Sequence, residues 1–174
     1  YFTTGPGSTN AITGLAGAWQ DSVPCLFISG QVKRVEAAYN SGIPKLRQFG
    51  VQELNIIPIV ESLCKYAVML NDPTKVRYEL EKAVHIAKSG RPGPVWIDIP
   101  MDVQAAVVDP SNLEKFVPSK DDKPILDSKQ IKTLVNFLKQ AKRPVIIAGR
   151  GVRLAGARVS LSKFVSEFGI PVVT

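Results

Sequence analysis

Residue types suited to binding a ligand gather near the start of the chain, in the run Gly5-Pro6-Gly7-Ser8-Thr9-Asn10. The residues before this run predict a strand, and the pattern after it predicts a helix. Two glycines let a backbone approach a ligand closely, and Ser8 or Thr9 can cap the helix so that its N-terminal N–H groups face that ligand. The run therefore favours an anion or the polar edge of a heterocycle, with a plain strand-to-helix turn as the alternative.

A second cluster of glycines follows a predicted strand near the end of the chain, at Gly149-Arg150-Gly151. In a dinucleotide-binding fingerprint, a third small residue stands three positions after the second glycine. Leu154 occupies that position here. An ordinary turn between a strand and a helix is therefore favoured over a dinucleotide site.

Titratable side chains elsewhere indicate structural roles more than catalytic ones. His85 is the only histidine, and it stands beside an apolar helix position away from both glycine runs, so we expect a structural or surface histidine. Asp98 and Asp102 bracket the end of an apolar run. Carboxylates placed there can serve catalysis, but this spacing favours turn caps or partners for the Arg91 guanidinium.

The elements that must position these residues follow from an alternation of short β-branched runs with longer helical patterns. This alternation is typical of a parallel sheet with helices on both faces, so the fold class is α/β, followed by the start of a second, Rossmann-like α/β domain. We expect a first domain at residues 1–107, a linker at 108–126 and the second domain from 127 to 174. Strands are predicted at 1–4, 25–29, 66–69, 95–99, 144–148 and 171–174, helices at 8–21, 53–63, 73–89, 127–141 and 155–168, and an exposed loop at 30–49.

Composition and charge exclude several classes of partner. The chain carries 22 Lys and Arg against 15 Asp and Glu, a net charge of +7, but the excess cations are scattered and no aromatic residues stand between them, which argues against nucleic acid. Apolar stretches are short and interrupted, so no membrane partner is expected. The chain has two isolated cysteines, Cys25 and Cys64, which predict neither a zinc site nor a disulfide. They favour a reducing, cytoplasmic compartment. Both ends read as cut, so we expect the chain to be an internal piece of a longer protein.

Several runs occur in an order that matches a known family. They are Thr4–Asn10, Ala18–Pro24, Ile28–Val32, Gln52-Glu53, Lys65-Tyr66, Gly90–Val95 and Asp98–Val103, followed by Lys142–Gly149 and Gly169–Thr174. Those up to Val103 resemble the pyrimidine-binding domain of thiamine-diphosphate-dependent enzymes of the acetolactate (acetohydroxyacid) synthase group. The last two are similar to the start of that family's central domain.

The resemblance implies the thiamine-diphosphate-binding fold and an enzyme that decarboxylates a 2-keto acid such as pyruvate and forms a carbon–carbon bond. It implies thiamine diphosphate as cofactor, Mg²⁺ bound through a domain that this chain does not contain, and FAD in the acetolactate synthases themselves. It also implies a homodimer or homotetramer whose active sites lie between subunits.

The resemblance assigns roles to individual residues of the chain. Gln52 corresponds to a catalytic residue, a polar group that reaches the reacting centre. The cofactor-binding positions are Gly5, Pro6, Gly7, Asn10, Gln31 and Arg91. Of these, Pro6, Gly7 and Asn10 correspond to the aminopyrimidine side of the pocket, and Arg91 to an arginine that touches FAD.

Three departures from the family pattern leave alternatives open. Val51 replaces a bulky phenylalanine, and the family's catalytic glutamate and its diphosphate- and magnesium-binding motif lie outside this chain, so we expect the chain alone to be inactive. A related enzyme with another donor or acceptor, for example in surface-sugar biosynthesis, is one alternative, for which the basic runs Lys33-Arg34 and Lys45-Leu46-Arg47 leave room. A non-catalytic fragment that acts as a binding module is the other.

Overall fold

The computed structural model describes residues 1–119 and 127–174. The chain divides into two compact units whose boundary falls within residues 120–126. Each unit is described by itself. The predicted linker, 108–126, lies partly outside the described residues, and the predicted domain bounds remain a prediction.

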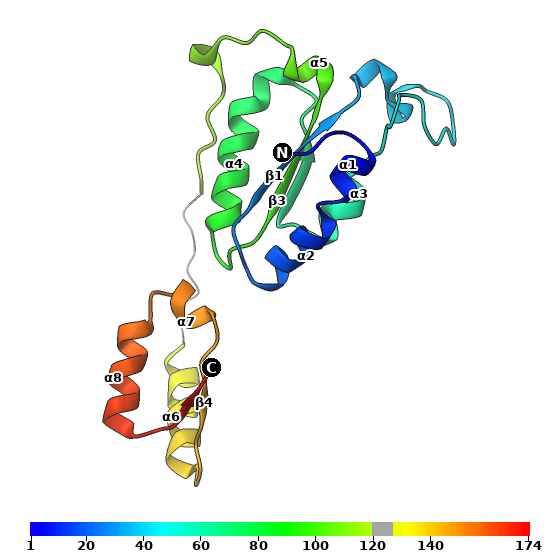
Figure 1. Ribbon diagram of the computed structural model, residues 1–174. Coiled ribbons are helices and arrows are strands. Elements are labelled where there is room, and N and C mark those ends of the chain that lie inside the picture. The colour runs from blue at the N-terminus through cyan, green and yellow to red at the C-terminus, as the bar shows by residue number, and fades with distance from the viewer. Residues whose placement is uncertain (120–126) are drawn as a thin grey trace. The chain divides into compact units, whose positions relative to one another are not determined.

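The first unit is built around a parallel sheet of three strands, ordered β1-β3-β2. They are β1 (Leu26–Gln31), β2 (Tyr66–Met69) and β3 (Val95–Pro100), and Leu26 and Tyr66 both pair with Val95. The helices α2 (Ile12–Gln20) and α3 (Ile57–Val60) lie on one face, and α4 (Val76–Lys88) covers the other (Figure 1). The predicted α/β class is thus confirmed.

The central strand β3 supplies both halves of the core because successive side chains point to opposite faces. Val95 and Ile97 pack with α4 residues such as Ala83, while Trp96 packs with Leu15 of α2 and with the α3 region. All four residues from Val95 to Asp98 are buried. This placement explains the nearly continuous apolar run of an inner parallel strand.

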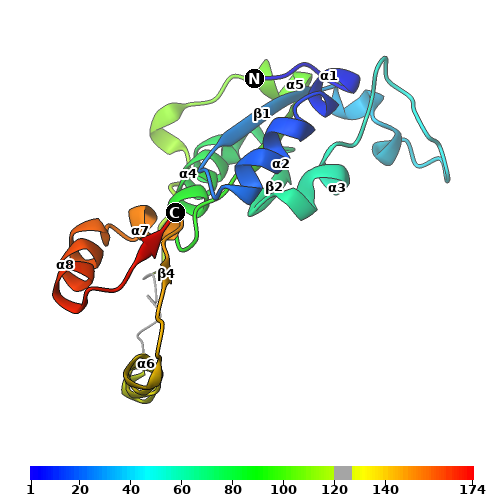
Figure 2. The ribbon, with the colours of Figure 1, turned by 60° about the horizontal axis from the view of Figure 1, so that its bottom comes forward.

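The remaining elements of the unit are short. They are α1 (Pro6–Thr9), α5 (Met101–Gln104) and the 3₁₀ helices η1 (Arg34–Glu36), η2 (Ala38–Asn40), η3 (Glu61–Leu63), η4 (Pro73–Lys75) and η5 (Pro110–Asn112). The chain after η2 forms a long loop that extends away from the sheet (Figure 2).

Three predicted elements of the first unit were wrong in extent. Residues 1–4 form only a single bridge, Phe2 to Ser29, instead of a strand. The predicted helix 8–21 breaks into α1 and α2, because the Ala11 N–H bonds to the Ser8 carbonyl, three residues back, in a tighter turn. The predicted helix 53–63 begins only at Ile57, where Pro58 falls in the first turn, the position that proline favours.

The second unit contains α6 (Ser128–Gln140), α7 (Gly151–Leu154), α8 (Arg158–Phe168) and two short parallel strands, β4 (Ile146–Ile147) and β5 (Val172–Val173). The capping box of α6 joins Asp127 and Gln130, as its start signals require. Both strands are shorter than predicted. The Ile146 N–H bonds to the Pro171 carbonyl and the Ala148 N–H to the Val173 carbonyl, so the pairing spans only a few residues. Among the described residues, no helix combines the length and the hydropathy needed to span a membrane.

Candidate functional site

The candidate site lies where the strands of the first unit end. The chain before Gly5 runs beside β1, since Phe2 and Ser29 pair in parallel, so Gly5 emerges near the carboxyl end of that strand. The turn that carries Gln52 reaches the same edge, because Gly50 lies against Val32, the residue after β1. Ligands of open α/β sheets bind outside the carboxyl ends of the strands.

Gly5 and Gln52 meet in an unusually close backbone contact. A Cβ atom at Gly5 would lie 2.0 Å from the Gln52 carbonyl oxygen, so no other residue fits there without movement. Both residues have positive φ, 59° in each case. A glycine accepts this backbone readily, whereas in glutamine it stores strain of the kind that collects at functional sites.

The Glu53 carboxylate holds the turn that carries Gln52. One of its oxygens accepts the Ala38 N–H at 2.6 Å, and the other accepts the N–H groups of Phe49 and Gly50 at 2.8 and 3.2 Å. Three backbone N–H groups from two segments of the chain therefore converge on one side chain. This arrangement keeps Gln52 in its strained conformation.

Gln31 connects the same turn to the strand and to the Gly5 segment. Its amide nitrogen donates to the Leu54 carbonyl at 2.7 Å and to Asp98 at 3.0 Å. Its amide oxygen accepts from the Thr4 hydroxyl at 3.1 Å and from the Val32 N–H at 3.0 Å. Both donors and both acceptor positions of the buried amide are therefore used within the chain.

Asp98 lies beneath this amide, and the sequence pattern alone gave no sign of its partners. It is fully buried, and it accepts hydrogen bonds from Ser29 at 2.6 Å and from Gln31. The Trp96 indole in turn donates to the Ser29 hydroxyl at 2.7 Å. Burial raises the pKa of Asp98 to about 6, although the hydrogen bonds from Ser29 and Gln31 oppose this rise.

The prediction that Asp98 caps a turn or meets Arg91 was wrong. Asp98 stands opposite Ser29 in the register of β3 and β1, and its hydrogen-bond partners are the neutral side chains of Ser29 and Gln31. A signal was present in the sequence: a carboxylate inside an almost wholly apolar run must find buried polar partners.

The helix after the glycine run is not capped as predicted. The Ser8 hydroxyl donates to the Gly5 carbonyl at 2.9 Å, and the Thr9 hydroxyl donates to the Pro6 carbonyl at 2.8 Å. Neither side chain accepts from a helix N–H, because both hydroxyls turn back on the preceding carbonyls. Asn10 and Gln52 are exposed, and within the described residues neither side chain makes a hydrogen bond.

Arg91 lies at the other edge of the sheet. It precedes the amino end of β3, and its Nε donates to the Ser22 hydroxyl at 2.7 Å. Together with Trp19, Gln20, Lys65 and Pro92, it lines a cavity of about 330 Å³. A strand of six residues spans roughly 20 Å, so the fold does not bring Arg91 to the Gly5–Gln52 contact.

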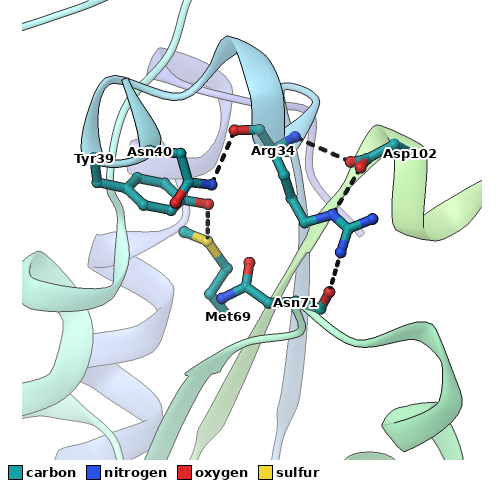
Figure 3. A network of polar contacts seen from close by, with 6 residues as sticks. All are labelled: Arg34, Tyr39, Asn40, Met69, Asn71 and Asp102. Carbon is teal, nitrogen blue, oxygen red and sulfur yellow. Dashed lines mark hydrogen bonds and ion pairs between the residues drawn. The ribbon is translucent and has the colours of Figure 1, made fainter. Parts of the chain in front are cut away.

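Asp102 forms a second polar network at the carboxyl edge, around Arg34 (Figure 3). The Arg34 N–H and Nε donate to its two oxygens at 3.0 and 2.7 Å, and the guanidinium also donates to the Asn71 carbonyl at 2.7 Å. Asp102 thus pairs with Arg34 and not with Arg91, because α5 follows β3 at the edge opposite to Arg91. Partial desolvation raises the pKa of Asp102, but the hydrogen bonds and the charge of Arg34 outweigh it and hold this pKa below its usual value.

The other residues singled out in the sequence lie elsewhere. His85 is on α4 and contacts the Phe116 ring, as expected of a structural histidine. Cys25 and Cys64 are free thiols, and burial raises the pKa of Cys64 to about 12, which makes it inert. Within the described residues, no group of three or more His, Cys, Asp or Glu side chains could hold a metal ion.

The first unit is thus an α/β unit with a glycine turn and a strained polar turn at the carboxyl ends of its strands, where open α/β sheets bind ligands. Residues 1–59 match the N-terminal TPP binding domain of thiamine pyrophosphate enzymes, and residues 131–174 match the central domain of these enzymes. The chain belongs to the thiamine pyrophosphate enzyme family.

Relatives with curated names span the same region. The chain is 40% identical to the acetolactate synthase large subunit of Corynebacterium glutamicum and 34% identical to the acetolactate synthase of Arthrospira platensis, over 99% of its own length in both cases. It is 38% identical to the glyoxylate carboligase of Escherichia coli O157:H7 over 98% of its length. These alignments cover 26%, 29% and 27% of the relatives, respectively, so the chain spans less than a third of each.

Proposed function

We propose that the chain forms the pyrimidine-binding side of the active site in a thiamine-diphosphate-dependent 2-keto-acid decarboxylase and carboligase that resembles acetolactate synthase. The observation that supports this most is the contact between Gly5 and Gln52, two left-handed residues 47 positions apart that are packed together at the carboxyl edge of the sheet. Strain maintained from several sides is typical of sites that must be pre-organised.

The side chains at this edge fit the aminopyrimidine of thiamine diphosphate. Asn10 and Gln52 present free amides, each with donors and an acceptor, beside the buried Gly5. The ring nitrogens of such a heterocycle accept hydrogen bonds and its amino group donates them, and a side-chain amide can match both. Pro6 and Gly7 form the first turn of α1 next to them and would line the same side of the pocket.

Gln52 is the residue we assign to orient the reacting groups, and Gln31 acts on the site through other residues. Since the Gln31 amide is saturated by Thr4, Val32, Leu54 and Asp98, it holds the two segments that carry Gly5 and Gln52. When bound, thiamine diphosphate supplies the nucleophilic carbon and the electron sink for decarboxylation. The chain supplies a rigid, neutral wall against which that group is oriented.

The proposed enzyme also needs a metal ion and a second subunit. Mg²⁺ would be held with the diphosphate by residues outside this chain, and FAD, where present, would contact Arg91 at the opposite edge of the sheet. The active sites would lie between the subunits of a homodimer or homotetramer.

The donor substrate depends on the space beside Gln52, and Val51 is the residue that sets this space. It stands beside Gln52 and is 84% exposed, and its side chain is smaller than that of a phenylalanine, so it would leave more room for a substrate. Pyruvate is the donor we favour, because two of the relatives above are acetolactate synthases. Glyoxylate, a surface-sugar acceptor, and a non-catalytic binding module are the alternatives that the assay must separate.

The test is made on the intact protein that contains this chain. We expect thiamine diphosphate to bind in calorimetric titrations only when Mg²⁺ is present, and pyruvate to be consumed with release of CO₂ and formation of acetolactate. Formation of tartronate semialdehyde from glyoxylate would move the assignment to the second kind of relative. Absence of coenzyme binding would remove the enzymatic proposal and favour the binding module.

A further inference from the structure

The long loop after η2 contains cations that the proposed chemistry does not use. Four basic residues stand between β1 and Gln52: Lys33, Arg34, Lys45 and Arg47. Two of them have acidic partners, since Lys33 lies 3.8 Å from Glu36 and Arg34 lies 2.7 Å from Asp102. The other two, Lys45 and Arg47, have neither an ion pair nor a hydrogen bond within the described residues.

Both unpaired cations line one cavity of about 450 Å³. Glu53, Leu54 and Asn55, the residues that directly follow Gln52, line the same cavity. The two oxygens of Glu53 accept three backbone N–H groups, which do not cancel the charge of a carboxylate. The lining therefore carries two unpaired cations against one carboxylate, close to the turn of the candidate site.

The loop that forms the cavity is held in shape by hydrogen bonds of its own residues. The Ser41 hydroxyl donates to the Ala38 carbonyl at 2.7 Å and accepts the Ile43 N–H at 3.1 Å. Lys45 itself has φ of 62°, a left-handed conformation that is uncommon for residues other than glycine. A loop fixed in this way positions its charges before a ligand arrives, which lowers the entropic cost of binding.

We propose that Lys45 and Arg47 form an oxyanion-binding subsite for the carboxylate or phosphate group of a carbonyl substrate that reacts beside Gln52. A guanidinium and an ammonium on one wall suit such a group, because a guanidinium bonds two oxygens at once and an ammonium adds a point charge. The identity of the carrier molecule rests on the proposed function. The binding of the oxyanion does not.

The test measures how fast Lys45 of the intact protein is acetylated by a succinimidyl ester, with peptide mass spectrometry as the readout. Inorganic phosphate, acetate and chloride are titrated at equal ionic strength, without thiamine diphosphate. We expect phosphate or acetate to slow the labelling of Lys45 saturably by at least about threefold, and chloride to have no such effect. The anion that protects Lys45 at the lower concentration tells whether the natural ligand group is a phosphate or a carboxylate.

Matched variants separate the subsite from general charge. Arg47→Gln should abolish the protection of Lys45, Arg47→Lys should retain part of it, and Lys33→Gln, which removes the same charge from the base of the loop, should leave it intact. Equal protection by chloride, or equal loss of protection in Lys33→Gln and Arg47→Gln, would overturn the proposal. Saturable protection in a protein that binds no thiamine diphosphate would instead remove the proposed function and keep the subsite.

Discussion

Two carboxylates four residues apart, Asp98 and Asp102, lie in opposite physical settings at the same edge of the sheet. Asp98 is fully buried and has only neutral partners, Ser29 and Gln31. Asp102 is partly exposed and pairs with a guanidinium, Arg34. The buried network holds the segments of Gly5 and Gln52, whereas the exposed network holds the long loop. A carboxylate can therefore fix a segment either by buried hydrogen bonds to neutral groups, as Asp98 does, or by a partly exposed ion pair, as Asp102 does.

Replacing Asp98 should have the largest effect on stability. Asp98→Ala leaves the buried Ser29 hydroxyl and one N–H of the Gln31 amide without an acceptor, and we expect a loss of about 2–4 kcal/mol in the free energy of unfolding. Asp102→Ala, the matched control, should cost about 1 kcal/mol or less because its ion pair is close to solvent. Urea unfolding at pH 5, followed by the fluorescence of Trp19 and Trp96, measures both. Equal losses would mean that the two networks do not differ.

The contributions of the two carboxylates to the free energy of unfolding should also change with pH in opposite directions. The pKa of Asp98 is raised from 3.8 to about 6 in the folded chain, so the folded state binds more protons between these values, and its contribution is lost as the pH rises through 6. This loss is up to about 3 kcal/mol. The pKa of Asp102 is lowered, so its contribution is present above its unfolded pKa and is lost as the pH falls. The difference in unfolding free energy between the wild type and Asp98→Asn, measured from pH 4 to 7, should show the first trend. A flat difference would show that Asp98 does not titrate in this range.

Gly5 tests whether the buried network serves a ligand site. An alanine Cβ at Gly5 would push the Gln52 carbonyl away, so Gly5→Ala should weaken thiamine diphosphate binding to the intact protein by about tenfold or more, or about 1.4 kcal/mol. Gly42 lies in the long loop and also has positive φ, 70°, but a Cβ there would meet nothing within 4 Å. Gly42→Ala therefore also places an alanine at positive φ, but without the clash. A similar loss of coenzyme affinity in both variants would show that strain alone, and not the Gly5–Gln52 contact, was responsible.

The sequence predicted this site in part, and the missing part depends on contacts between distant residues. The glycine run and the apolar strand around Ile97 carry local signals of turn chemistry and burial, so their positions and the α/β class could be predicted. The partners of Asp98 could not, because Ser29 becomes its neighbour only through the register of two strands 69 residues apart. Likewise, Asp102 was expected near Arg91, since both flank β3, but the length of that strand separates them.

Loosening the exposed network should have the smallest effect on stability and a local effect on motion. Arg34→Gln removes the bonds to the Asp102 carboxylate and the Asn71 carbonyl, while the backbone N–H of residue 34 can still bond Asp102. We expect the unfolding free energy to change by less than about 1 kcal/mol, and the amides of residues 34–50 to exchange hydrogen faster. Arg77→Gln is the matched control, because Arg77 forms an ion pair of similar exposure with Glu81 on α4. Faster exchange of the loop in Arg34→Gln alone would show that Asp102 acts on the loop through Arg34. Unchanged exchange in that variant would mean that Glu53, and not the Arg34 network, fixes the loop.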